Sequence, residues 1–271
     1  MSKVWLITGA SRGFGRQFAL AALGRGDRVV ATARDVETLH DLKAEYGNAL
    51  VPLTLDVTDK SAAADVVATA VDAFGQLDVV VNNAGYGLFG AVEELSEDDI
   101  RAQMETNFFG ALWVTQAALP QLRRQKSGHI VQISTIGGVA AFPRLGGYHA
   151  SKWALEGMSE ALAQEIAPFG IKVTLVEPGG YATDWAGSSA AHAAPIEAYE
   201  GLRAQMAAGS GRALSGDPEA AGPALLQIVD AEKPPLRVFF GTMPLKLIEG
   251  VYAQRLATWK EWERTSIAAQ G

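Results

Sequence analysis

The chain has 271 residues, of which 48% are hydrophobic and 20% are charged, and its formal net charge is -7. This composition is typical of a folded globular protein, and we expect one domain over residues 1–271. The chain has no cysteine and four scattered histidines, which excludes disulfides, thiolate nucleophiles and zinc-thiolate sites and predicts no metal site. The acidic balance argues against a nucleic-acid partner. With no long apolar run and no secretion signal, we expect no membrane partner and a cytoplasmic location.

Short apolar runs rich in Val and Ile alternate with longer helical patterns. Such runs are typical of parallel strands that are buried on both faces of a sheet. Because strands alternate with helices, the pattern predicts a doubly wound α/β fold with a predominantly parallel, seven-stranded sheet and helices on both faces. The predicted strands are residues 4–7, 28–31, 50–53, 79–81, 130–133, 172–176 and 238–240.

Two further segments differ in composition from the rest. Residues 183–217 are rich in Ala, Gly and Ser, and we expect them to form a mobile segment that covers a site. A helical extension is predicted at about residues 244–264, with Tyr252, Leu256, Trp259 and Trp262 at helical spacing. Core packing is the more frequent explanation of such a stripe, and the alternatives are that it covers the pocket or docks on another subunit.

A glycine-rich turn follows the first predicted strand, in the run Thr8-Gly9-Ala10-Ser11-Arg12-Gly13-Phe14-Gly15. Glycines there let the backbone turn sharply and approach a pyrophosphate, while the N-terminus of the following helix attracts the phosphates. The spacing differs from the commoner Gly-x-Gly-x-x-Gly pattern. A tight structural turn is the alternative, but its place in the first strand-helix unit favours dinucleotide binding.

Tyr148 and Lys152 lie four residues apart in the helical pattern after the fifth strand. At this spacing two side chains share one helix face, so the ammonium group favours ionisation of the phenol and lowers its pKa. A phenol tuned in this way can exchange protons near neutral pH. Taken alone, such a pair is also common by chance on solvated helices.

Together with four further motifs, the turn and this pair resemble the short-chain dehydrogenases/reductases over roughly the first 180 to 190 residues. The resemblance implies a Rossmann-type fold and hydride transfer between a nicotinamide and a carbonyl or alcohol carbon. The further motifs are Asn82-Asn83-Ala84-Gly85, Asn107, Ile133-Ser134-Thr135 and Pro178-Gly179-Gly180, in the family's order.

The resemblance implies a role for each catalytic candidate. Tyr148 is the proton donor to the carbonyl oxygen in reduction and the base in oxidation, and Lys152 lowers its pKa and holds the nicotinamide ribose. Asn107 holds a water that links the lysine to solvent. The hydroxyl that orients the substrate carbonyl is a serine in most members, and Thr135 stands at that position here. Ser134, one residue away, remains the alternative, because neighbouring strand residues point to opposite sides.

Cofactor choice depends on the end of the second strand, where an acidic residue usually bonds the adenosine ribose in NAD-selective members. Ala33 stands at that position, and Arg34 together with Arg12 is suited to binding a 2'-phosphate. We therefore expect NADP rather than NAD. Two alternatives are that both arginines are solvated loop residues and that Asp35 reaches the ribose after a small backbone shift.

The resemblance carries further contacts over by position. Residues expected to contact the cofactor are Gly9, Ser11, Arg12, Gly13, Phe14, Gly15, Arg34, Asp56, Val57, Asn83, Ala84, Gly85, Tyr148, Lys152, Pro178, Gly179 and Thr183. Residues expected to form the substrate pocket are Tyr86, Leu88, Phe142, Leu145, Tyr181 and Trp185. Because these are largely apolar or aromatic, they favour an apolar or aryl ketone or aldehyde. His149 is expected to be a packing residue.

The sequence thus predicts an NADP-dependent ketoreductase of the short-chain dehydrogenase/reductase type, which acts on a small-molecule carbonyl or alcohol. Alternatives are a dinucleotide-binding sensor or scaffold, an NAD-dependent hydroxysteroid-type dehydrogenase, and an epimerase or dehydratase. The family resemblance implies a homodimer or homotetramer. The helix that begins near Tyr148 carries Trp153, Leu155, Met158 and Leu162, which suit either an interface or the core.

Overall fold

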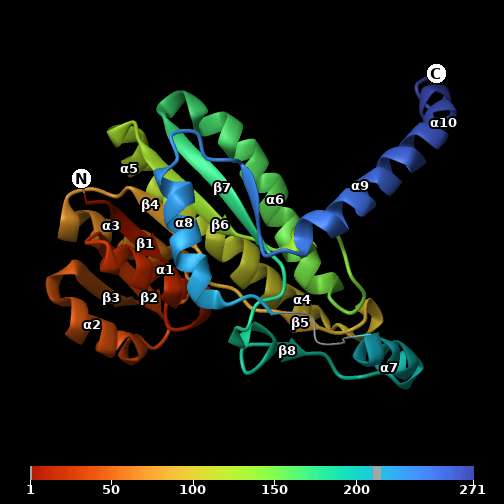
Figure 1. Cartoon of the computed structure of the whole chain (residues 1–271), viewed down its shortest axis with the longest axis horizontal. Coiled ribbons are helices and arrows are strands. Elements are labelled where there is room, and N and C mark those ends of the chain that lie inside the picture. The colour runs from red at the N-terminus through yellow and green to blue at the C-terminus, as the bar shows by residue number, and fades with distance from the viewer. Residues whose placement is uncertain (1, 210–214) are drawn as a thin grey trace.

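The computed structural model describes residues 2–209 and 215–271, and in this part of the chain seven strands form one parallel sheet (Figure 1). Their spatial order is β3-β2-β1-β4-β6-β7-β9. The strands are β1 (Val4–Ile7), β2 (Arg28–Ala33), β3 (Leu50–Thr54), β4 (Val79–Asn82), β6 (Gly128–Ile133), β7 (Ile171–Pro178) and β9 (Arg237–Phe240). Each predicted strand is present, which confirms the doubly wound α/β fold.

Helices cover both faces of this sheet (Figure 1). The α-helices of the described residues are α1 (Gly13–Gly24), α2 (His40–Tyr46), α3 (Lys60–Phe74), α4 (Glu97–Met104), α5 (Gly110–Gln125), α6 (Gly146–Ile166), α7 (Glu200–Gly209), α8 (Ala221–Asp230), α9 (Pro244–Glu261) and α10 (Glu263–Ala268). Successive side chains of a strand point to opposite faces, so Trp5 and Ile7 pack with α1 and α8, whereas Val4 and Leu6 pack with α3 and α5.

The strand order reverses between β1 and β4, since β1 lies between β2 on one side and β4 on the other. In open α/β sheets, ligands bind at such a switch point, beside the carboxyl ends of the strands. The glycine-rich turn follows β1, and the Asn83-Ala84-Gly85 run follows β4. The topology therefore brings these two motifs together at one edge of the sheet.

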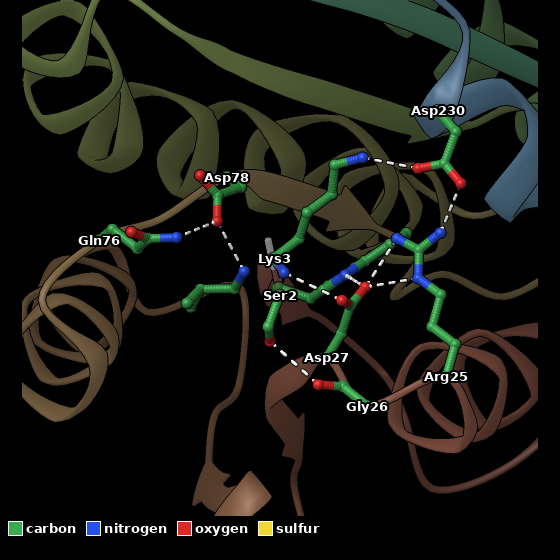
Figure 2. A network of polar contacts seen from close by, with 10 residues as sticks. Ser2, Lys3, Arg25, Gly26, Asp27, Gln76, Asp78 and Asp230 are labelled. Atoms are coloured by element: carbon green, nitrogen blue, oxygen red, sulfur yellow. Dashed lines mark hydrogen bonds and ion pairs between the residues drawn. The ribbon is translucent and has the colours of Figure 1, made fainter.

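A charged network closes the opposite, amino edge of β1 (Figure 2). The buried carboxylate of Asp27 accepts hydrogen bonds from the backbone of Lys3 at 2.9 Å, from Trp5 Nε1 at 2.8 Å and from Arg25 Nε at 2.7 Å. Asp230, at the end of α8, pairs with Lys3 and Arg25, each at 2.6 Å. Because this network lies away from the carboxyl ends of the strands, we interpret it as structural.

A second, two-stranded parallel sheet was not predicted. It pairs β5 (Leu88–Phe89), soon after β4, with β8 (Ala191–His192), in the segment after β7. The predicted covering segment, residues 183–217, contains β8 and α7, and its residues 210–214 lie outside the described part of the chain.

The apolar stripe of the C-terminal helices does not pack in the core as had been expected. α9 contacts the body from its first turns, where Ile248 is buried, as far as Arg255, which donates to the carbonyl oxygen of Val139 at 2.8 Å. It then projects away from the body together with α10 (Figure 1). Tyr252, Leu256, Trp259 and Trp262 are 44% to 64% exposed. Core packing was therefore the wrong explanation of this stripe, because helical spacing shows that residues share a face but not what the face meets.

The apolar residues on α6 lie in different environments: Leu155 and Leu162 are buried, whereas Trp153 is 43% exposed. Within residues 2–209 and 215–271, no helix has both the length and the apolar character needed to cross a bilayer.

Candidate active site

The glycine-rich turn forms a backbone cradle that has no room for a side chain at Gly9 or Gly15. A Cβ atom at Gly9, whose φ is +66°, would lie 2.9 Å from Ala84 Cα, and one at Gly15 would lie 2.4 Å from the Gly9 carbonyl oxygen. Thr8 fastens the two motifs together, because its hydroxyl accepts hydrogen bonds from the backbone N–H groups of Asn83 and Ala84, both at 3.0 Å. Only glycine fits at Gly9 and Gly15 without displacing these neighbours.

Helix α1 begins at Gly13, directly after the turn. Arg12 occupies its N-cap position in an extended conformation, and its side chain makes no capping hydrogen bond. The first N–H groups of a helix lack partners within the helix and carry a partial positive charge. The close backbone approach and this helix terminus fit the pyrophosphate of a dinucleotide.

A cavity of about 840 Å³ opens beside the carboxyl ends of the strands. Its volume lies in the range of ligand pockets in proteins. Of the predicted residues it is lined by Gly9, Ser11, Arg12, Gly13, Phe14, Arg34, Asp56, Val57, Asn83, Ala84, Gly85, Tyr86, Ser134, Thr135, Phe142, Leu145, Tyr148, Lys152, Pro178, Gly179, Tyr181, Thr183 and Trp185. Gly15, Leu88 and Asn107 lie behind this lining.

Tyr148 lies in the first turns of α6 and is 5% exposed. Burial raises the pKa of its phenol, and hydrogen bonds with the side chains of Thr135 and Trp185 act in the opposite direction. This differs from the expectation that Lys152 lowers that pKa. The Lys152 ammonium lies 6.0 Å from the centre of the Tyr148 ring and is bonded elsewhere, so the desolvation of the phenol dominates.

Lys152 is buried one turn further along α6, and its Nζ donates a hydrogen bond of 2.8 Å to the carbonyl oxygen of Ile133. Burial lowers the pKa of Lys152 to about 8, while the nearby carboxylate of Glu156 raises it. The ammonium thus sits between the end of β6 and the cavity. From this position it can reach a ligand that lies along the strand ends.

The two candidate hydroxyls at the end of β6 face different neighbours. The Thr135 side chain lies beside the Tyr148 phenol, and its Oγ1 accepts the N–H of Gly137 at 3.2 Å. Ser134 is 4% exposed and faces the carboxyl group of Glu156; burial raises the pKa of that group, and the Ser134 hydroxyl acts in the opposite direction. Of the two, only Thr135 is placed beside the phenol.

Asn107 lies in a π-helical turn, Glu105–Phe109, between α4 and α5. Its amide donates to the Tyr86 carbonyl oxygen at 3.0 Å and to Ser151 Oγ at 3.1 Å, and its Oδ1 accepts the Tyr86 N–H at 3.1 Å. A Cβ at Gly85 would meet both Asn107 Oδ1, at 3.0 Å, and Lys152 Nζ, at 3.6 Å. The asparagine and the lysine therefore converge on Gly85, and such π-turns are frequent at functional sites.

The residues expected to select the cofactor lie in different environments. Arg12 Nη1 forms a 2.8 Å ion pair with Asp184 and donates to Ser188 Oγ at 3.2 Å. Arg34 is exposed at the cavity wall and makes no hydrogen bond or ion pair within the described ranges 2–209 and 215–271. Asp35 caps the short 3₁₀ helix Val36–Leu39 by accepting the Glu37 N–H at 3.1 Å, and it does not line the cavity.

Aromatic rings form the wall of the cavity that faces the phenol. The Trp185 ring centre lies 4.9 Å from that of Tyr148 and 5.3 Å from that of Phe89 in β5. Tyr181 stacks edge-on against Phe14 at 4.9 Å. Thr183 stands at the N-cap of the 3₁₀ turn Asp184–Ala186, but its side chain makes no capping bond.

His149 also lines the cavity, which its position next to Tyr148 in the chain did not indicate. Its Nδ1 accepts the N–H of Phe142 at 3.2 Å, and burial lowers its pKa to about 4. The ring is therefore neutral at pH 7 and holds the Phe142 loop in place. Phe89 was missed for a different reason, since it reaches Trp185 only through the unpredicted β5–β8 pairing.

The comparisons with known proteins show the family of the chain. The family model of the short chain dehydrogenases matches residues 3–194. Oxidoreductase BOA17 of Botryotinia fuckeliana is 42% identical over 273 residues, which cover 99% of this chain and 100% of that protein.

Two solved structures are similar over most of the chain. A short-chain dehydrogenase from Streptomyces avermitilis has a TM-score of 0.91 and 42% identity, covering 99% of this chain and 98% of that one. An alcohol dehydrogenase from Thermococcus sibiricus, complexed with 5-hydroxy-NADP, has a TM-score of 0.75 and 26% identity, covering 90% and 98%. By sequence, fold and motif order, the chain belongs to the short-chain dehydrogenase/reductase family of oxidoreductases.

Proposed function

We propose that this protein is an NADP-dependent ketoreductase that moves hydride between the nicotinamide and the carbonyl carbon of an apolar or aryl ketone or aldehyde. The observation that carries the proposal is the convergence of Tyr148, Thr135 and Lys152 on one cavity beside the carboxyl ends of the strands. A proton donor, a second hydroxyl and a cation at one point are what carbonyl reduction requires.

In this proposal Tyr148 protonates the carbonyl oxygen as the alcohol forms and removes the alcohol proton in the reverse reaction. Burial keeps its phenol protonated at neutral pH, which suits the reductive direction. Thr135, placed beside the phenol, donates a hydrogen bond to the same carbonyl oxygen and orients it. Bound nicotinamide supplies or accepts the hydride.

Binding of the dinucleotide is assigned to the cradle and to Lys152. The backbone around Gly9 and Gly13 takes the pyrophosphate at the N-terminus of α1. Lys152 binds the nicotinamide ribose. Asn107, which like Lys152 lies beside Gly85, holds the water that links the lysine to solvent. Thr183 binds the carboxamide, since its hydroxyl is not used in capping.

The preference for NADP is supported by three side chains. Arg34 is exposed at the cavity wall with no protein partner in the described ranges 2–209 and 215–271. Arg12 is part of the glycine-rich turn and also lines the cavity. Asp35 is engaged in capping the 3₁₀ helix. A guanidinium group suits a 2'-phosphate, and Asp35 does not line the cavity.

The substrate class is proposed from the walls around the phenol. Trp185, Phe142 and Leu145 present apolar surface to the cavity, and the histidine behind Phe142 is neutral. Such a lining favours apolar or aryl groups on either side of the carbonyl. We also expect a homodimer or homotetramer, and the exposed Trp153 of α6 is available for such an interface.

The test is to follow oxidation of NADPH and of NADH with a broad panel of aryl and alkyl ketones and aldehydes. The proposal expects turnover that is faster with NADPH and that falls when the substrate carries a charged group. Silence across the panel, despite tight cofactor binding, would favour a dinucleotide sensor instead. Equal rates with both cofactors would remove the NADP assignment and leave the rest intact.

A further inference from the structure

A charged cluster lies behind Lys152, on the side away from the cavity. Arg237 of β9 binds three carboxyl groups: Glu156 at 3.0 Å and Glu160 at 2.7 Å, both from α6, and Glu177 of β7 at 3.5 Å. Glu160 is 55% exposed, whereas the side chains of Glu156 and Glu177 are 6% and 1% exposed. The cluster thus contains two buried acids and one cation.

The hydrogen bonding of the two buried acids is incomplete if both are ionised. Among the described residues, neither carboxyl oxygen of Glu177 has a hydrogen-bond partner, and Oε1 of Glu156 has none. The two side chains lie close enough to hydrogen-bond to each other once one of them carries a proton. Two carboxylates in contact repel each other and have no donor to share. One proton between them removes the repulsion and gives one oxygen of each group a hydrogen-bond partner.

Glu177 is the member of the pair that holds this proton. Glu156 receives the closer contact from Arg237 and also faces the hydroxyl of Ser134, and both stabilise a carboxylate. Glu177 is farther from the guanidinium. Burial, followed by the charge of Glu156, raises the pKa of Glu177 to about 8.

The pair is connected to the proposed active site through α6. Glu156 follows Lys152 by one helical turn, so both side chains lie on the same face. Burial lowers the pKa of Lys152 to about 8, and Glu156 is the group that opposes this effect. Ser134, beside Glu156, directly follows Ile133, whose carbonyl oxygen accepts the hydrogen bond of the ammonium.

We propose that Glu177 carries a proton that it shares with Glu156, and that the carboxylate of Glu156 so maintained keeps Lys152 in its protonated, ribose-binding form. Glu156 and Glu177 are then positioning residues, since they touch neither substrate nor cofactor. Arg237 balances the one remaining buried negative charge, and the exposed Glu160 serves only to hold the guanidinium. The role assigned to Lys152 rests on the proposed function, whereas the shared proton does not.

The shared proton is tested by infrared spectroscopy of the folded protein at neutral pH. A protonated carboxyl group gives a C=O stretch that is separate from the carboxylate bands. We expect this band in the wild type, its loss in Glu177→Gln, and its retention in the matched control Glu160→Gln. Absence of the band from the wild type, or its persistence in Glu177→Gln, would overturn the shared proton without any variant having to be active.

The link to Lys152 is tested by the pH dependence of kcat/KM for ketone reduction, which reports groups of the free enzyme. Without the carboxylate of Glu156, Lys152 loses its proton at lower pH, so Glu156→Gln should move the alkaline limb down by about one pH unit. Glu160→Gln should leave the limb in place. A Glu156→Gln variant that loses rate uniformly, with no displaced limb, would show a merely structural role.

The two tests separate the inference from the proposed function. If the wild type reduces no carbonyl, the proposed function fails while the infrared result still decides whether the proton is shared. If the wild type is active and the limb does not move in Glu156→Gln, the function stands and the positioning role is wrong.

Discussion

Arg12 and Asp184, which are 172 residues apart in the chain, form an ion pair of 2.8 Å across the mouth of the cavity. The pair joins the glycine-rich turn after β1 to the segment after β7. The next residue, Trp185, lies against the phenol of Tyr148. One short stretch of chain therefore contacts both the cradle and the proton donor. Because both partners are partly exposed, the ion pair itself contributes little to stability.

Because Arg12 is already paired with Asp184, substitution of Arg34 tests cofactor choice more directly than substitution of Arg12. Arg34→Ala should weaken NADPH binding by about tenfold or more, because a charge-assisted bond to the 2'-phosphate is lost. NADH carries no such phosphate, so its affinity should change little. Titration of both cofactors by fluorescence would measure the two dissociation constants.

The matched control for this experiment is Arg16→Ala. Arg16 pairs with Asp41 on the outer side of α1 and does not line the cavity. It should therefore leave both affinities unchanged. If Arg34→Ala weakened the two cofactors equally, Arg34 would not read the 2'-phosphate.

Tyr148→Phe should lower kcat for ketone reduction by about 10² to 10⁴-fold, the usual contribution of a general acid. The ring and its packing against Trp185 are preserved, so NADPH affinity should stay the same. Steady-state rates and cofactor titrations on the same preparation would check both statements. Retained turnover would mean that another group protonates the carbonyl oxygen.

Thr135→Val and Ser134→Ala separate the two hydroxyls at the end of β6. Valine keeps the shape of threonine but loses the hydroxyl beside Tyr148, so kcat should fall by about 10² to 10³-fold. Ser134 faces Glu156 rather than the phenol, and its loss should have a small effect on kcat. A larger loss in Ser134→Ala would reverse the assignment. Circular dichroism of both variants would verify that they are folded.

His129 makes stability depend on pH on the acid side. It is buried in β6, its Nε2 lies 2.9 Å from Thr174 Oγ1, and burial lowers its pKa from 6.5 to about 4. The unfolded chain therefore binds a proton at higher pH than the folded one. The stabilisation is complete above pH 6.5 and is lost as pH falls from 6.5 to about 4, by about 3 kcal/mol in total.

Urea unfolding of the wild type and of His129→Gln at neutral and mildly acidic pH would measure this dependence. The variant should lose less free energy of unfolding between the two conditions. Part of the dependence should remain, because burial also lowers the pKa of His149. The exposed His40 provides the control, and His40→Gln should behave like the wild type. An identical slope in His129→Gln would contradict the assignment.

Much of the fold follows from local patterns. β1, β2 and the other strands of the main sheet are near-continuous apolar runs. Such runs are typical of parallel strands that are buried on both faces of a sheet. Gly9 and Gly15 were recognisable because a glycine-rich turn in the first strand-helix unit favours dinucleotide binding. Tyr148 and Lys152 share one helix face by their spacing, and they were recognisable because the other family motifs accompany them in order.

The tertiary structure decided what depends on contacts between distant segments. Tyr252 and Trp259 face solvent, although apolar residues at helical spacing in other helices of the chain are buried in the core. Phe89 contacts Trp185, which comes from a distant segment of the chain. The raised pKa of Tyr148 likewise comes from the surroundings that bury it. The cluster of Glu156, Glu177 and Arg237 joins α6, β7 and β9, and no local pattern contains it. Short-range periodicity thus determined the elements and the motif residues, whereas burial, neighbours and charge state arise only when the sheet brings separate strand ends together.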